Sequence, residues 1–279
     1  MKAGYLLLGV VVLFATSLLF AVLSEAKIDP ETIAGMWLFD EGRGKVAKDS
    51  SGNDNHGNLT NNPKWEDGKF GGALEFDGTA AHVNCGNGQT LDIKKELTVM
   101  AWVRFDAVDY KGGTGGLFTI AAKGYPDALA PHAGWWFSHD NRNGGQGFNY
   151  TCFGKGAGGW AGGGNNMSGR DFQFDKGEWY HLAITVGDSI GKMYVDATEL
   201  GNEKQFLDLK LSDTTRDLTI GSAGNNGWYF NGRIDEVAIF SVALEEADLK
   251  TIMKRGLLES FDVAASGKFT TTWAHIKAR

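Results

Sequence analysis

Short β-type segments separated by turn residues limit most strongly the folds open to this chain. From residue 35 to residue 240, runs rich in aromatic and β-branched residues alternate with turns built from Gly, Asn and Asp. Runs of this kind, bounded by turn residues, are typical of β-strands. The expected strands are residues 36–39, 73–76, 97–105, 117–121, 135–138, 148–153, 179–186, 193–195, 218–220 and 234–240.

Periodicity supports this interpretation. Residues 179–186 place apolar side chains at every second position, which is the pattern of a strand with one face on a core. Residues 244–255 form the one convincing helix, with acidic residues at its start. Many strands followed by a single late helix predict an all-β sandwich and argue against an α/β fold.

The first 26 residues are expected to direct the chain out of the cytoplasm. No charge lies between Lys2 and Glu25, and residues 5–23 are almost wholly apolar. A short basic start, an apolar run and small residues before position 27 predict a signal peptide cut after Ala26. An uncleaved membrane anchor through residues 5–23 is the alternative, because ~20 apolar residues can span a bilayer. Either way, we expect a secreted or extracytoplasmic protein, possibly anchored at the surface.

The remaining chain is expected to be one domain, residues 27–256, followed by a tail, residues 257–279. The tail fits an added strand, a partner-docking segment or a loose end equally well. The net charge of −7 gives no basic face that could follow a phosphate backbone, so nucleic-acid binding is not expected.

The chain has two cysteines, Cys85 and Cys152. Outside the cytosol they could pair and close a long loop. The alternative is a pair of buried thiols that act as small hydrophobic residues. A disulfide between them is slightly favoured.

Two motifs that suggest enzymes fail in their context. Residues 187–191 match G-x-S-x-G, but a strand follows where a nucleophile elbow requires a helix. Residues 154–159 match G-x-G-x-x-G without a following helix or a later acidic residue. No expected strand carries a pair of acids on one face, as glycoside hydrolysis requires. The chain is therefore not expected to be an enzyme.

A dense set of oxygen ligands occurs in residues 49–57. Carboxylate and amide oxygens in a glycine-bearing turn suit Ca²⁺, which takes six to eight oxygen ligands. An Asx-rich turn whose side chains cap their own backbone explains the same composition equally well.

Residues 106–178 are rich in glycine and hold interleaved aromatic residues, which predicts long loops on a β scaffold. Aromatic rings with amides and charges at their edges suit a sugar, whose ring faces are apolar and whose rim carries hydroxyls. Core packing is an equally good account of Trp135 and Trp136. The candidate ligand-binding residues are Trp135, Trp136, Asn141, Arg142, Tyr150 and Trp160.

Several motifs occur in an order that resembles a known family. They include W-L-F-D-E-G at 37–42, G-G-A-L-E-F-D-G at 71–78 and G-R-I-D-E-V at 232–237. Together with shorter matches, they resemble the bacterial laminin-G-like domains of the concanavalin A-like lectin/glucanase superfamily over roughly residues 34–255. The resemblance implies a jelly-roll sandwich of two curved antiparallel sheets, closed by pairing the first strand with residues 234–240.

The resemblance also implies a structural Ca²⁺ ion. It makes Asp235 the best ligand, with Asp40 and the 49–53 turn, through Asp49 and Asn53, as weaker candidates. The E-x-D-x-x-E strand of the superfamily's glucanases does not occur in this sequence.

Three functions remain open in a definite order. The first is a secreted or surface carbohydrate-binding module, Ca²⁺-stabilised and non-catalytic, whose partner is a glycan or extracellular polysaccharide. The second is a protein-adhesion module that binds other surface proteins, and the remote third is a polysaccharide-active enzyme. The fold alone does not separate them.

Overall fold

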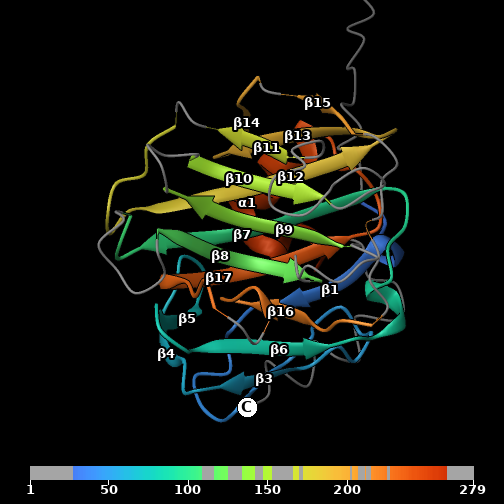
Figure 1. The fold of residues 1–279 in the computed structure, drawn as a ribbon. Coiled ribbons are helices and arrows are strands. Elements are labelled where there is room, and N and C mark those ends of the chain that lie inside the picture. The colour runs from blue at the N-terminus through green and yellow to red at the C-terminus, as the bar shows by residue number, and fades with distance from the viewer. Residues whose placement is uncertain are drawn as a thin grey trace, which may run out of the picture.

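Two antiparallel β-sheets packed face to face make up the protein (Figure 1). The computed structural model describes residues 28–108, 116–124, 134–141, 147–152, 166–169, 172–201, 203–206, 211, 215–224 and 227–262. The architecture confirms the all-β jelly-roll sandwich with one helix late in the chain.

The nine-stranded sheet, here called sheet A, has the order β14-β13-β12-β7-β17-β5-β4, with β1 also paired to β17 and β15 to β13. Its strands are β1 (Ile33–Trp37), β4 (Lys64–Asp67), β5 (Gly72–Asp77), β7 (Leu97–Phe105), β12 (Trp179–Gly187), β13 (Ile190–Val195), β14 (Thr198–Glu199), β15 (Lys204–Gln205) and β17 (Asn231–Phe240). The pairing of β1 with β17 joins the first and last strands, as the resemblance implied.

The eight-stranded sheet, here called sheet B, has the order β11-β10-β9-β8-β16-β6-β3-β2. Its strands are β2 (Val46–Ala47), β3 (Gly57–Thr60), β6 (His82–Gly86), β8 (Leu117–Lys123), β9 (Trp135–Asp140), β10 (Gly147–Cys152), β11 (Asn166–Gly169) and β16 (Leu218–Ile220). Two short 3-10 turns, η1 (Pro30–Thr32) and η2 (Gln89–Leu91), complete the regular structure with helix α1 (Glu246–Asp262).

The main core lies between the two sheets. It is built from large buried side chains of both, among them Trp37 and Phe105 from sheet A and Phe118 and Phe137 from sheet B. Helix α1 covers the outer face of sheet A, where its Leu249 joins a second apolar cluster. In Figure 1 sheet B lies in front and α1 behind sheet A, so the view is onto the outer face of sheet B.

Two local expectations are confirmed or extended. Residues 187–191 form the turn between β12 and β13, with Asp188 and Ser189 at positive φ, so no nucleophile elbow exists there. The helix continues past the expected end at Arg255 to Asp262, with a non-helical break at Gly256. No helix within the described residues is long and apolar enough to cross a membrane, and residues 1–26 lie outside the described residues.

The expected disulfide between Cys85 and Cys152 is wrong. Cys85 lies in β6 and Cys152 in β10, and β16, β8 and β9 separate these strands in sheet B. Four inter-strand steps of ~4.8 Å place the two backbones ~19 Å apart, whereas a disulfide needs Cα atoms within ~7 Å. Cys85 is a buried free thiol, and burial raises its pKa.

Candidate functional site

The outer face of sheet B carries a row of side chains that crosses the strands. Strand registers place Trp136 of β9 opposite Ala122 of β8, Ala122 opposite Thr219 of β16, and Thr219 opposite Asn84 of β6. Neighbouring residues on β9, such as Trp135 and Phe137, belong to the core instead. Because successive side chains of a strand alternate between faces, the row lies on the side away from the core.

Two tryptophans meet on this face. The ring centroids of Trp136 and Trp228 are 4.8 Å apart, with an angle of 43° between the ring planes. The indole Nε1–H of Trp136 donates a hydrogen bond of 2.8 Å to Thr119 Oγ1, which fixes the orientation of the ring. Both rings pack against a small apolar cluster formed with Leu117, Ala122 and Ala223.

Trp228 is the more accessible of the two rings. Trp136 is only 7% exposed, whereas Trp228 is half-buried. Trp228 has a φ of 52°, which is uncommon for a residue with a large side chain. Its carbonyl oxygen accepts a hydrogen bond of 3.0 Å from the backbone N–H of Thr119 on β8. The backbone is therefore held in an unfavourable conformation that places the Trp228 ring beside Trp136.

A second ring pair lies further along the same face. The rings of His82 and Tyr229 have centroids 6.1 Å apart and are tilted by 36°. His82 lies two residues before Asn84 on β6, so it points to the same side of the sheet as the row. Tyr229 is half-buried and follows Trp228 directly in sequence. One loop thus supplies an aromatic residue to each pair.

The hydroxyl of Ser138 adds a polar group near the tryptophans. Ser138 occupies the outer-face position of β9 next to Trp136 and lies in register with Thr119 and Asn149. Its Oγ is buried and has no hydrogen-bond partner among the described residues. A buried polar atom without a partner is uncommon in folded proteins and needs an explanation such as a water molecule or a ligand.

The sequence-based ligand candidates separate in the structure. Trp135 packs in the core between the sheets at 1% exposure, so it cannot stack on a sugar, while Trp136 lies on the outer face. Asn141 follows the opposite end of β9, and its amide donates to the carbonyl of Val108. The backbone of Tyr150 is in register with the core residues Phe137 and Met167. Arg142, Trp160 and the side chain of Tyr150 lie outside the described residues.

Sequence reasoning missed Trp228 and Tyr229. Both lie in the run Gly227-Trp228-Tyr229-Phe230, where a turn residue precedes three aromatic residues. The signal was present, but the chain offers no alternation there to show which ring enters the core. Phe230 does so, and it packs against Phe76 and Phe105.

The acidic residues expected to bind metal form two separate groups. At the first, a loop of residues 68–72 folds over the side chain of Asp235 on β17. The backbone N–H groups of Lys69 and Phe70 donate to Asp235 Oδ2 at 2.8 and 2.9 Å, and Gly72 N–H donates to Asp40 Oδ1 at 2.7 Å. Asp235 Oδ1 is buried and has no partner among the described residues.

Burial and mutual repulsion raise the pKa values at this loop. Burial, with a contribution from the Asp40 charge, raises the pKa of Asp235 to about 7. Burial and the Asp235 charge raise the pKa of the neighbouring Glu236 to about 8. The three acids therefore influence one another, and a cation would relieve the cost of ionising them.

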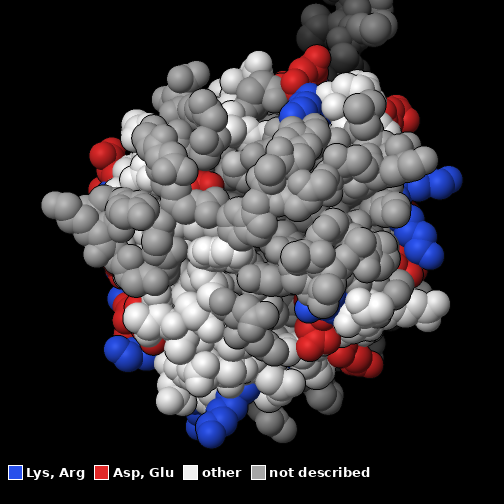
Figure 2. All heavy atoms as spheres, viewed as in Figure 1, with Lys and Arg blue, Asp and Glu red and all other residues white. Residues whose placement is uncertain are grey.

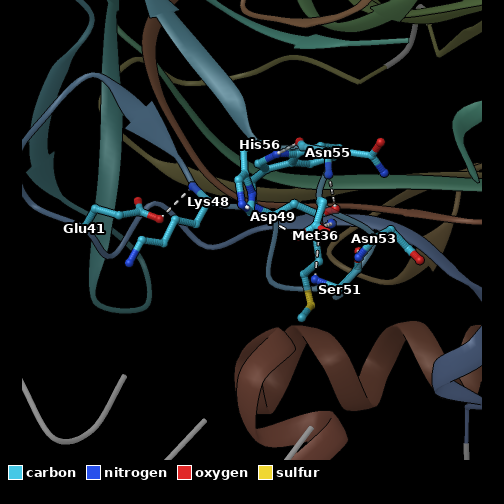
Figure 3. Close-up of polar contacts among 10 residues, drawn as sticks. Met36, Glu41, Lys48, Asp49, Ser51, Asn53, Asn55 and His56 are labelled. Atoms are coloured by element: carbon cyan, nitrogen blue, oxygen red, sulfur yellow. Dashed lines mark hydrogen bonds and ion pairs between the residues drawn. The ribbon is translucent and has the colours of Figure 1, made fainter. Parts of the chain in front are cut away.

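The second group, the 49–56 turn, uses its side chains to hold its own backbone (Figure 3). Asp49 Oδ1 accepts hydrogen bonds of 2.9 Å from Met36 N–H and Ser51 N–H, and Asp49 Oδ2 accepts one of 2.9 Å from Asn55 N–H. The Asn53 amide donates to the carbonyl of Ile33 at 2.8 Å. This arrangement is the Asx-rich turn that was the alternative to a Ca²⁺ loop.

The fit of these residues to Ca²⁺ is partial. Among the described residues, no three His, Cys, Asp or Glu side chains gather as a metal-ligand set. Asp235 and Asp40 lie on one loop and leave Asp235 Oδ1 available, whereas the oxygens of Asp49 are already engaged. A cation at Asp235 would need further oxygens from backbone carbonyls or water.

Three solved structures show the same fold at low sequence identity. Domain 4 of AbnA, an extracellular GH43 arabinanase from Geobacillus stearothermophilus solved with arabinotriose, is 20% identical with a TM-score of 0.60; the match covers 80% of this chain and 98% of that one. The binding domain of Paraclostridial Mosquitocidal Protein 1 is 13% identical with a TM-score of 0.60, over 80% of this chain and 52% of that one. Trypanosoma rangeli sialidase is 15% identical with a TM-score of 0.53, over 80% of this chain and 32% of that one.

Comparison with curated protein sequences finds no match. The family model Laminin_G_3, described as concanavalin A-like lectin/glucanases superfamily, matches residues 77–250, which is more than half of the chain. The matched residues include most of both sheets and the start of α1. The chain therefore belongs to the concanavalin A-like lectin/glucanases superfamily.

Proposed function

We propose that the protein is a non-catalytic carbohydrate-binding module that holds a glycan on the outer face of sheet B. The Trp136–Trp228 pair carries this proposal. It places a half-buried indole on a sheet face that also presents hydroxyl and amide side chains. The arabinanase domain solved with arabinotriose has a similar fold, which supports a glycan as the partner.

The chemistry of the pair suits a sugar ring. The C–H faces of a sugar stack on an indole, and the ring hydroxyls reach polar groups at its edge. An aromatic contact is worth ~1 kcal/mol beyond the area that it buries. The position of Trp136 beneath Trp228, fixed by Thr119, prepares the platform before the ligand arrives, which lowers the cost of ordering on binding.

Binding is proposed in preference to catalysis because of where the acids lie. Hydrolysis of a glycosidic bond needs two carboxyl groups on opposite sides of the bond. Among the described residues, the acids that act on one another are Asp40, Asp235 and Glu236, on sheet A and its loops. The aromatic rings lie on the other sheet.

The test is a glycan array followed by calorimetric titration of the purified chain. Trp228→Ala is expected to weaken binding at least ~fivefold, which corresponds to the loss of ~1 kcal/mol of stacking. Trp179→Ala is the matched control, because Trp179 is also half-buried but lies on sheet A. A folded protein that binds no glycan would overturn the proposal and favour protein adhesion instead.

A structural Ca²⁺ ion at Asp235 and Asp40 is a secondary proposal. The buried, unpartnered Oδ1 of Asp235 and the repulsion among nearby acids support it. A rise in melting temperature on adding Ca²⁺, absent in Asp235→Asn, is the expected result. The same rise in both proteins would place any bound ion elsewhere.

We also propose a secreted or surface-anchored location, on the basis of residues 1–26. Cell fractionation, combined with N-terminal sequencing of the mature chain, would separate cleavage after Ala26 from an uncleaved anchor. Recovery of the full-length chain in the cytoplasm would contradict both forms of the proposal.

A further inference from the structure

The two ring pairs on sheet B are too far apart for one sugar ring. Trp136 lies on β9 and His82 on β6, with β8 and β16 between them. Three inter-strand steps of ~4.8 Å give a separation of ~14 Å across the sheet. A single pyranose or furanose ring is much shorter than this span, so it could stack at one pair only.

The loop that bears Trp228 and Tyr229 is fixed on both sides. The carbonyl of Trp228 accepts from Thr119 N–H at 3.0 Å, and the carbonyl of Phe230 accepts from Gly78 N–H at 2.9 Å. Phe230 N–H donates in turn to the carbonyl of Gly221 at 2.9 Å. Tyr229 therefore lies between two anchored residues, and both rings are presented in a set arrangement.

The surface between the pairs is polar without charge. The outer-face positions there are Thr219 and Asn84, and both have their side chains engaged: Thr219 Oγ1 donates to the carbonyl of Ser222, and the Asn84 amide donates to Asp217 Oδ2 at 2.9 Å. In Figure 2, the described surface in the middle of this face is white, and the blue and red groups gather towards its margins. The described residues thus offer little there to hold an acidic sugar.

We propose that the site recognises an internal stretch of a neutral oligosaccharide that runs across the strands, with Trp228 and Tyr229 as two separate stacking subsites. This inference rests on the proposed function and deepens it. It assigns a role to Tyr229 and His82 and selects a neutral chain in preference to a terminal or acidic sugar.

The first experiment measures affinity against chain length. The probes are linear neutral oligosaccharides of the arabino, xylo and gluco series, from one to six residues, titrated into the purified chain. Affinity for the series that binds should rise at least ~fivefold between the short and the long members, the factor given by one more stacked face. Affinity that does not change with length would overturn the inference and leave the proposed function standing.

The second experiment separates the two subsites. Tyr229→Ala should abolish the gain with length and leave the affinity for the shortest bound probe unchanged, whereas Trp228→Ala should weaken every probe. Tyr229→Phe keeps the ring and should restore the gain, which a merely structural defect of Tyr229→Ala would not predict. Trp179→Ala is the control on sheet A, and thermal melts confirm that each variant is folded.

Two further outcomes are decisive. Tighter binding of sialylated or uronate-containing oligosaccharides than of neutral ones would overturn the assignment of a neutral chain. Binding of no probe and no array glycan by the folded protein would overturn the proposed function itself, and the inference with it.

Discussion

The backbone N–H of Leu257 points at the carboxylate of Glu236, and both carboxylate oxygens lie 3.0 Å from the nitrogen. Glu236 has a φ of 46° and occupies the irregularity of β17 between Asp235 and Ala238. Leu257 follows the break in α1 at Gly256. A bulge in a central strand thereby holds the second part of the helix against sheet A, where Leu257 is fully buried.

This relationship predicts that Gly256→Ala destabilises the protein. Gly256 has a φ of 78°, and a Cβ atom there would lie 2.8 Å from Glu236 Oε1 and 3.2 Å from the Phe70 ring. A left-handed conformation costs a non-glycine residue ~1–2 kcal/mol, and the close contacts add to this. Gly177→Ala is the matched control, because Gly177 has a φ of 82° and open space around it. Chemical denaturation should show the larger loss for Gly256→Ala, and equal losses would contradict the packing described here.

Glu236→Gln should make the protein more stable than wild type at alkaline pH. The pKa of Glu236 is raised to about 8, first by burial and then by the Asp235 charge. Between its unfolded value of ~4.5 and 8, the folded state keeps a proton that the unfolded state has lost, so stability falls as pH rises through this window. Glutamine stays neutral and still offers an oxygen to Leu257 N–H.

The measurement is the free energy of unfolding from pH 4 to 9 in the presence of a chelator, which keeps divalent cations from competing with protons. Near pH 8.5 the variant should be more stable by ~1–3 kcal/mol, and below pH 4.5 the two proteins should agree. A constant difference across the whole range would show that the carboxylate does not titrate as described.

His181→Phe should reduce acid sensitivity. His181 is buried on the outer face of sheet A with its ring centroid 5.4 Å from that of Trp102, and burial lowers its pKa to about 3. The unfolded chain binds a proton near pH 6.5 that the folded protein does not, so stability falls as pH drops from 6.5 towards 3. Phenylalanine keeps the ring and removes the titration. The loss of stability between pH 7 and 4.5 should become ~2 kcal/mol smaller, and an unchanged loss would mean that other groups govern acid unfolding.

The sequence predicts most of the sandwich because its central strands have clear period-two patterns and turn residues at their ends. β7, β9, β12 and β17 all appear within a few residues of their expected bounds. The short edge strands β2, β4 and β14 were missed, since so few residues carry no period. Strand order was available only through the resemblance, and this is why the Cys85–Cys152 pairing failed.

The candidate site was less predictable than the fold. Two adjacent tryptophans, Trp135 and Trp136, must face opposite sides of a strand, but the sequence does not state which one enters the core. The partner of Trp136 is Trp228, which lies far along the chain and reaches the sheet through a residue at positive φ. Both facts depend on tertiary packing, which local patterns do not encode.

The last prediction separates the two interpretations of the 49–57 segment. Asp49→Ala removes the acceptor of three backbone N–H groups and leaves those of Met36 and Asn55 unpaired in buried positions (Figure 3). Each unpaired group costs ~1–3 kcal/mol, so the variant should lose about 3 kcal/mol of stability. Asp49→Asn should lose less, because one oxygen remains. Asp54→Asn makes the same change on a side chain that is 92% exposed and should have no effect.

Because the Asp49 carboxylate acts through backbone donors, the loss in Asp49→Ala should be the same in Ca²⁺ and in chelator. Thermal melts of Asp49→Ala, Asp49→Asn, Asp54→Asn and wild type under both conditions provide the check. A loss that appears only when Ca²⁺ is present would show that Asp49 is a metal ligand after all. It would also move the Ca²⁺ site from Asp235 to the turn beside β1, since a cation there would have to displace the Met36, Ser51 and Asn55 N–H groups from the carboxylate.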